Sequence, residues 1–114
     1  MLYFYNMSSA KKDDLVYKAL ADRRRREILD LLRDEPRTTG DICAQFNDLD
    51  RCTVMQHLGV LENADLVITK KEGRYRWNYI NAVPIREIYD RWINKYASKS
   101  VEVLTKLKHD LDSN

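Results

Sequence analysis

The sequence predicts a mainly α-helical domain that carries one β-hairpin. Over most of the 114 residues, apolar side chains recur at spacings of three and four, the period of helices that bury one face. Between Leu66 and Ile80 the period falls to two, and Gly73 lies in the middle of this stretch, so two strands joined by a tight turn are expected. Three Gly and two Pro in the whole chain favour helices over a turn-rich fold.

The size and composition limit the class of protein. A chain of 114 residues fits one domain with a modest core. It contains no apolar run of the ~18 residues that a membrane span needs, so no membrane association is expected. Two cysteines fit reduced thiols in a cytoplasmic protein better than a disulfide framework. The net charge of +2 says little as a total, so the distribution of charge matters more.

Nothing in the sequence indicates catalysis or a cofactor. There is no glycine-rich phosphate loop, no Ser or Cys nucleophile with a plausible His base, and no distinctive carboxylate pair. We therefore expect a binding protein and not an enzyme.

Four helices are expected before the hairpin. The first, in residues 11–21, has apolar residues at helical spacing, and the second, in residues 22–32, begins at Asp22 as its N-cap. Pro36 ends the second helix, and either Thr38 or Thr39 can cap a short third one. The side chains expected to face inward from these three helices are Leu15, Val16, Ala19, Leu20, Ile28, Leu29, Leu31, Leu32, Ile42, Cys43 and Phe46.

The fourth helix begins at Arg51 behind Asp50 as its cap, and the hairpin follows it. Pro84 fits the first turn of a long closing helix. That helix carries two apolar stripes that are offset from each other, which predicts a bend or break at residues 97–100. The expected order is α-α-α-α-β-β-α.

The stretch RCTVMQHLGVLENADLV, residues 51–67, combines two kinds of side chain on one helix. Its start carries hydrogen-bonding groups, whereas Val54, Leu58 and Leu61 form an apolar stripe that can hold the helix to the body. A short helix, a tight turn and such a second helix form a helix-turn-helix, whose second helix enters the DNA major groove. With the hairpin as a wing, the sequence predicts a winged helix-turn-helix. An ordinary amphipathic helix with a solvated face is the alternative.

The side chains of this helix suit the reading of bases. Arg can bind guanine and Gln adenine through paired hydrogen bonds, and Thr offers a hydroxyl and a methyl group. No acidic residue lies between Arg51 and Leu61 in a chain rich in Asp and Glu. His57 is interpreted mainly as a packing residue that can also reach DNA. The DNA-binding residues expected on this helix, and at the start of the short helix before it, are Arg51, Cys52, Thr53, Gln56, His57, Thr38 and Thr39.

Two basic clusters fit the same surface. The hairpin contributes Lys71, Arg74 and Arg76 as candidates for phosphate contacts. The other cluster, Arg23 to Arg26, lies in the first turn of its helix, where cations oppose the helix dipole. Successive residues point about 100° apart on a helix, so one or two of these arginines, Arg25 first, are expected to meet phosphate. The others are expected to pair with Asp or Glu.

Four segments together resemble a known family. ALADRRRREILDLL, TTGDICAQF, RCTVMQHLGVLENADLV and KKEGRYRWNYI, in this order and spacing, are similar to the ArsR-type winged-helix repressors. The resemblance covers roughly residues 13–90. It implies a dimeric bacterial repressor that binds a palindromic operator in double-stranded DNA, with an inducer that the sequence does not indicate.

The resemblance also implies that the first and last helices build the dimer interface. We therefore expect a single domain in which residues 1–12 are an N-terminal arm, residues 13–83 are the DNA-binding core and residues 84–114 are a dimerisation helix. The expected interface residues are Leu15, Ile85, Ile88, Tyr89, Trp92, Tyr96, Leu104 and Leu107.

The chain departs from the metal-sensing members of that family. Their soft-metal site has a C-x-C pair where this chain has Thr38 and Gly40, neither of which can supply a thiolate. Their zinc site needs several His and carboxylates on the closing helix, where this chain has His109 with Asp110 and Asp112. No metal site is therefore expected. A further departure is Gly59, at a position where relatives often carry a phosphate-binding Lys.

Two alternatives remain open at this point. Cys52 near the exposed start of the reading helix, with Cys43, would allow a redox-responsive repressor, because a helix N-terminus stabilises a thiolate. A winged helix can instead recognise a protein, for which the aromatic LYFY segment, Trp77, Tyr79 and Trp92 are candidates. Dimer packing and wing packing account for the same aromatic residues.

Overall fold

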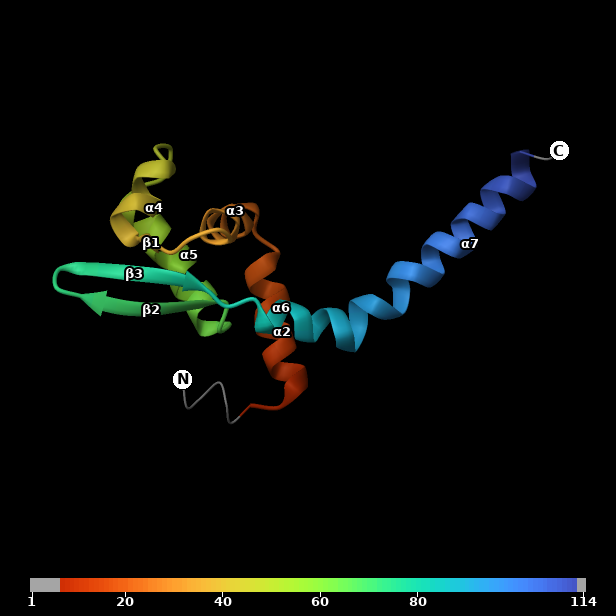
Figure 1. The fold of residues 1–114 in the computed structure, drawn as a ribbon, viewed down its shortest axis with the longest axis horizontal. Helices are drawn as coiled ribbons and strands as arrows, with labels where there is room; N and C mark the ends of the chain where they lie inside the picture. Colours follow the sequence, from red (N-terminus) through yellow and green to blue (C-terminus); the bar gives the residue numbers. More distant parts are fainter. Residues whose placement is uncertain (1–6, 113–114) are drawn as a thin grey trace. The chain divides into compact units, whose positions relative to one another are not determined.

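The computed structural model describes residues 7–112, and at residues 98–101 it describes the backbone alone. Two compact units divide the chain, residues 1–84 and residues 85–114. The first unit contains helices α2 (Ser9–Leu20), α3 (Arg23–Leu32), α4 (Thr39–Gln45) and α5 (Arg51–Asn63), followed by a hairpin (Figure 1). The predicted order of elements is confirmed, although α2 begins at Ser9, inside the segment expected to be an arm. Residues 1–6 of that arm lie outside the described residues.

Three helices begin at the caps that the sequence predicts. Asp22 accepts a hydrogen bond from the Arg24 amide at 2.8 Å, and Asp50 accepts one from the Thr53 amide at 2.7 Å. Thr38 caps α4 by accepting from the Asp41 amide at 3.1 Å. Each cap satisfies an amide that has no partner within its helix.

The hairpin belongs to a three-stranded antiparallel sheet. Strands β2 (Val67–Glu72) and β3 (Tyr75–Ile80) pair throughout, and Gly73 at the turn has φ +60°, as the hairpin prediction requires. On the other side of β3, a strand of two residues, β1 (Arg37–Thr38), pairs with Asn78 and Trp77. The sequence did not predict β1, because two residues are too few to show an alternating pattern.

The core of the first unit lies around α5, which packs against α2, α3, α4 and β2. In Figure 1, α5 runs beside the hairpin with α4 next to its start. Leu31 and Cys43, both expected to face inward, are only half-buried. The buried apolar side chains of this unit are Val16, Ala19, Ile28, Leu29, Leu32, Ile42, Phe46, Val54, Leu58, Leu61, Ala64, Leu66 and Val67.

The chain ends in a helical run with an irregular turn. Helix α6 (Val83–Ile88) leads into a π-helical turn, η1 (Tyr89–Ile93), and then into α7 (Asn94–Asp112). The break expected at residues 97–100 is wrong, since α7 is helical throughout that segment. A π turn contains about one extra residue, which rotates everything after it by about 100°. This rotation offsets the mismatch between the two apolar stripes, so no break is needed. No described helix has the length and apolar composition of a membrane span.

Candidate nucleic-acid interface

Helix α5 presents its polar start to solvent and buries its apolar stripe. Arg51, Cys52 and Gln56 are exposed and Thr53 is half-buried. On the opposite side, Val54, Leu58 and Leu61 are buried in the core, and α4 packs against α5 across the turn. This geometry is that of a helix-turn-helix whose second helix can offer base-contacting groups to a groove.

Asp50, the acidic residue that precedes α5, is hydrogen-bonded to the start of that helix. The hydrogen bonds from the amide and the hydroxyl of Thr53 lower the pKa of Asp50 below its usual range. The carboxylate therefore stays ionised at neutral pH while it caps the helix. From Arg51 to Leu61 no other acid opposes a phosphate backbone.

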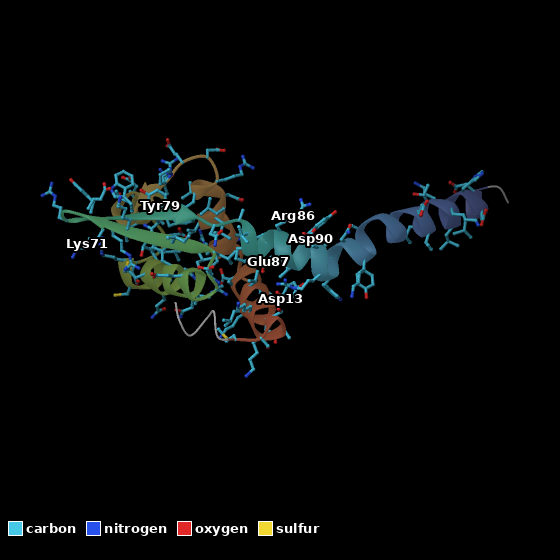
Figure 2. The ribbon with its side chains drawn as sticks, turned by 60° about the horizontal axis from the view of Figure 1, so that its bottom comes forward. Asp13, Lys71, Tyr79, Arg86, Glu87 and Asp90 are labelled. Atoms are coloured by element: carbon cyan, nitrogen blue, oxygen red, sulfur yellow. The ribbon has the colours of Figure 1, made fainter. Side chains whose placement is uncertain are left out.

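The tip of the hairpin is basic and exposed. Lys71 extends from the hairpin near its turn in Figure 2, and Arg74 lies in the turn. The guanidinium of Arg74 lies 5.1 Å from the centre of the Tyr75 ring and donates to the Tyr75 hydroxyl at 3.0 Å. The tyrosine thus supports Arg74 while leaving it accessible.

Arg76, the third expected cation of the hairpin, is held by α5. Its Nη2 lies 2.7 Å from Oε2 of Glu62, and Thr69 donates to the other carboxylate oxygen of Glu62 at 3.2 Å. Glu62 therefore links both strands of the wing to the reading helix. Glu62 was not predicted as a functional residue, and the available signal in the sequence was its position four residues, about one helical turn, after Leu58.

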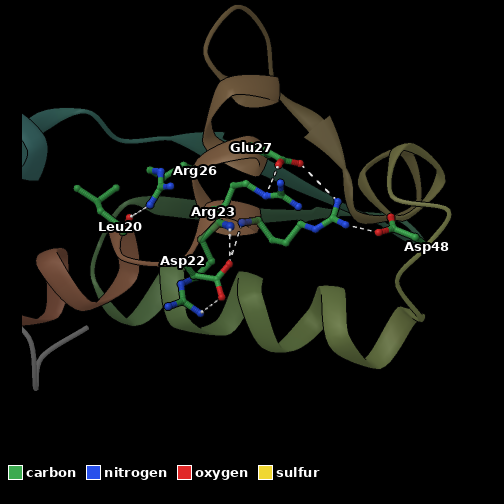
Figure 3. A network of polar contacts seen from close by, with 8 residues as sticks. Leu20, Asp22, Arg23, Arg26, Glu27 and Asp48 are labelled. Carbon is green, nitrogen blue, oxygen red and sulfur yellow. Dashed lines mark hydrogen bonds and ion pairs between the residues drawn. The ribbon is translucent and has the colours of Figure 1, made fainter.

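The arginines of α3 are engaged within the chain, and Figure 3 shows this network. Arg23 pairs with Glu27 at 3.3 Å, and Arg24 pairs with both Glu27 and Asp48. Arg26 donates to the carbonyl of Leu20 at 2.6 Å. The pairing with acids is as expected. These contacts join the arginines to groups of the same chain.

Arg25, the arginine expected at phosphate, has hydrogen-bond partners within the chain. Its side chain is only 14% exposed, and it donates to the carbonyls of Ala19 at 2.7 Å and Lys18 at 3.0 Å. A third contact joins Nη1 to Nδ1 of His57 at 3.3 Å. These partners are too far away in sequence to be read from a helical pattern. Arg25 is therefore a structural residue in the free protein.

The two threonines before α4 are also occupied. The Thr38 hydroxyl oxygen caps α4, and Thr39 is buried, with its hydroxyl accepting from Nδ2 of Asn78 at 3.1 Å. The burial of Thr39 disfavours the expected contact with DNA. The predicted DNA-binding residues whose side chains stay exposed are Arg51, Cys52, Gln56, Lys71 and Arg74, whereas Thr53 is half-buried and its hydroxyl bonds to Asp50.

The two cysteines differ in their exposure to solvent. Cys52 is exposed, Cys43 is half-buried, and both are free thiols. Among residues 7–112, no three His, Cys, Asp or Glu side chains gather in a way that could hold a metal ion.

The residues expected at a dimer interface are mostly exposed. Ile85 and Leu15 are half-buried and Ile88 is buried, and the part of each in a dimer stays a prediction. On the second unit, Trp92 and Tyr96 contact each other edge to face with ring centres 5.4 Å apart. The exposed expected residues are Tyr89, Trp92, Tyr96, Leu104 and Leu107.

The chain is similar to known regulators. Residues 20–69 match the sequence model of a family described as a helix-turn-helix domain. The transcriptional repressor SdpR of Bacillus subtilis is 30% identical over 84 residues, which cover 74% of this chain and 91% of SdpR. The arsenical resistance operon repressor of Staphylococcus aureus is 31% identical over 84 residues, covering 70% of this chain and 76% of that protein.

A solved structure of a regulator has a similar fold. The crystal structure of an ArsR family transcriptional regulator superposes with a TM-score of 0.66 at 25% identity, covering 84% of this chain and 93% of that one. Together with the exposed polar edge of α5 and the basic wing, these similarities show that the chain belongs to the ArsR-type family of winged helix-turn-helix transcriptional repressors.

Proposed function

We propose that the protein is a homodimeric repressor that binds a palindromic operator and has no metal-sensing site. The observation that carries this proposal is the exposed, acid-free start of α5, held in place by the buried stripe of Val54, Leu58 and Leu61. The relative SdpR is named a transcriptional repressor, which supports the same role here.

Each accessible side chain has a distinct task in this proposal. Arg51 and Gln56 read bases in the major groove, where they can form paired hydrogen bonds with guanine and adenine. Thr53 adds a hydroxyl and a methyl group. Lys71 and Arg74 at the wing bind phosphates, which adds affinity for any sequence.

Dimerisation supplies the second reading helix. The exposed apolar side chains of η1 and α7 are unfavourable in water, and burying them against the same surface of a second copy removes this cost. A two-fold dimer would place two α5 helices about 34 Å apart, in successive major grooves. Such a dimer recognises a palindrome.

The positions of the family's thiolate pair support a signal other than a soft metal. Thr38 uses its hydroxyl oxygen as a helix cap and Gly40 has no side chain. Soft metals prefer thiolate ligands. The proposed repressor therefore responds to another inducer or to none.

Selection of random duplex DNA with the purified protein tests the proposal. The expected result is an enriched motif with two inverted halves whose centres are about 10 base pairs apart. Enrichment of a single half-site without symmetry would contradict the dimer, and no enrichment in dilute salt would contradict DNA binding.

Two variants then test the reading residues on the selected duplex. Arg51→Ala and Gln56→Ala should each weaken discrimination at one base pair per half-site by about 1–3 kcal/mol. Asn63→Ala, an exposed change at the far end of the same helix, serves as the control and should leave discrimination unchanged. If Arg51→Ala and Gln56→Ala discriminate between base pairs as well as Asn63→Ala does, α5 does not read the bases.

A further inference from the structure

Arg25 is fixed to the end of α2 by two hydrogen bonds. Its Nε donates to the carbonyl of Ala19 and its Nη2 to the carbonyl of Lys18. The last carbonyls of a helix lack partners within it and carry its negative dipole end, which suits a cation. The side chain of Arg25 is 14% exposed, so solvent competes little for these bonds.

The third nitrogen of the same guanidinium contacts the reading helix, α5. Nη1 of Arg25 lies 3.3 Å from Nδ1 of His57, which is half-buried on α5 directly after Gln56. A guanidinium can only donate hydrogen bonds, so Nδ1 of His57 accepts and the ring proton lies on Nε2. One side chain of α3 thus joins the end of α2 to the polar half of α5.

Asp22 completes the arrangement from the cap of α3. Its Oδ2 lies 3.8 Å from Nη1 of Arg25. Burial raises the pKa of Asp22, but the hydrogen bonds from the amides of Arg24 and Arg25 and the positive charge of Arg25 outweigh this effect, so the net shift of the pKa is downward. The carboxylate is ionised at neutral pH and keeps the guanidinium oriented between α2 and α5.

This arrangement controls the part of α5 that carries the base-contacting groups. Glu62 ties the later half of α5 to the wing, and Leu58 and Leu61 hold it to the core. Next to Gln56, the contact between His57 and Arg25 joins α5 to α3 and, through the bonds of Arg25 to Ala19 and Lys18, to α2. Base contacts require placement within about 0.5 Å, whereas long basic side chains at the wing can follow a phosphate.

We propose that Arg25 and His57 are positioning residues that set the sequence discrimination of α5 without touching DNA. The inference rests on the proposed DNA-binding function. Loss of the hydrogen bond would let the start of α5 shift, so that bases are read less accurately while phosphate binding persists.

The test compares affinity for the duplex selected by the wild type with affinity for a scrambled duplex of the same length. His57→Leu removes the acceptor, and His57→Asn keeps an acceptor close to the position of Nδ1. We expect His57→Leu to lower the ratio of the two affinities about tenfold or more, with binding to the scrambled duplex nearly unchanged. His57→Asn should restore most of the ratio. Arg25→Lys should behave like His57→Leu, because one ammonium cannot serve both carbonyls and the imidazole.

The outcomes separate the inference from the function on which it rests. If the wild type binds neither duplex, the proposed function fails. If the wild type discriminates and His57→Leu discriminates equally well, or weakens both duplexes alike, the positioning role is wrong. Should His57→Leu not fold, as judged by circular dichroism, the comparison of His57→Asn with Arg25→Lys decides. Equal ratios for these two variants would then overturn the inference.

Discussion

The guanidinium of Arg76 lies 2.7 Å from the carboxylate of Glu62, and this ion pair ties β3 of the wing to the later half of the reading helix. The wing and α5 are therefore coupled by charge as well as by packing. The same carboxylate accepts a hydrogen bond from the hydroxyl of Thr69, so both strands contact it. The proposed phosphate contacts of the wing therefore depend on how Glu62 positions the two strands.

A double-mutant cycle measures this coupling. Glu62→Gln, Arg76→Gln and the double variant should give an interaction free energy of about 0.5–1 kcal/mol in urea unfolding, because both side chains remain partly exposed to water. A coupling near zero would mean that the pair does not hold the wing in solution.

Arg74 is expected to contact phosphate and no base. Arg74→Ala should weaken binding to all duplexes alike and make the slope of log K against log salt shallower by about one. Arg33→Ala provides a matched control, because Arg33 is an exposed arginine that pairs with Asp34 on another part of the unit. If Arg74→Ala alters sequence preference, the wing does not act as proposed.

Glycine substitutions should act in opposite directions at two sites. A Cβ at Gly59 in α5 would meet no atom within 4 Å, so Gly59→Ala should stabilise the protein by about 1 kcal/mol through helix propensity. Gly73 has φ +60°, where a side chain is strained, so Gly73→Ala should destabilise it by roughly 1–2 kcal/mol. Thermal or urea unfolding measures both. Stabilisation by Gly73→Ala would contradict the turn geometry.

The cap of α5 predicts an acid-dependent contribution to stability. The pKa of Asp50 is lowered in the folded protein by its hydrogen bonds with Thr53, so the ionised carboxylate stabilises the fold at neutral pH. That contribution is lost as the pH falls through the folded-state pKa, below about pH 4. Asp50→Asn keeps a capping oxygen without the charge.

The difference in unfolding free energy between the wild type and Asp50→Asn should therefore shrink from pH 7 to pH 3. Asp14→Asn, an exposed change on α2, controls for the loss of one negative charge. A difference that stays constant with pH would rule out the ionised cap as its source.

The second unit is expected to form the contact between two copies. Trp92→Glu places a charge among the exposed apolar side chains of η1 and α7 and should yield monomers in sedimentation experiments. These monomers should bind a half-site but not a full palindrome tightly. Asn94→Glu adds the same charge to an exposed polar position and should remain dimeric. Dimers retained by Trp92→Glu would exclude this surface as the interface.

The local features of the fold could be predicted from the sequence. Asp22 and Asp50 cap helices through amides two or three residues away, and Gly73 marks a turn between adjacent strands. Such signals lie within a few residues of one another, so a short window of sequence contains them.

The partners of the long charged side chains could not be predicted. Arg25 meets His57 across 32 positions and Arg76 meets Glu62 across 14, and only the packing of helices and strands brings these groups together. The sequence pattern identified basic residues near the reading helix but could not show which of them are neutralised within the chain. For the same reason it could not separate Arg76, which pairs with Glu62, from Lys71 and Arg74 at the exposed tip of the hairpin.

The irregular turn at Tyr89–Ile93 sets the direction in which the side chains of the closing helix point. Because the turn accommodates one extra residue, deleting a single residue there would restore a regular α-helix and leave the downstream leucines on the side where they already lie. Deleting one residue from the regular part of α7 would instead rotate the side chains beyond it by about 100° and change the surface that the proposed dimer would share.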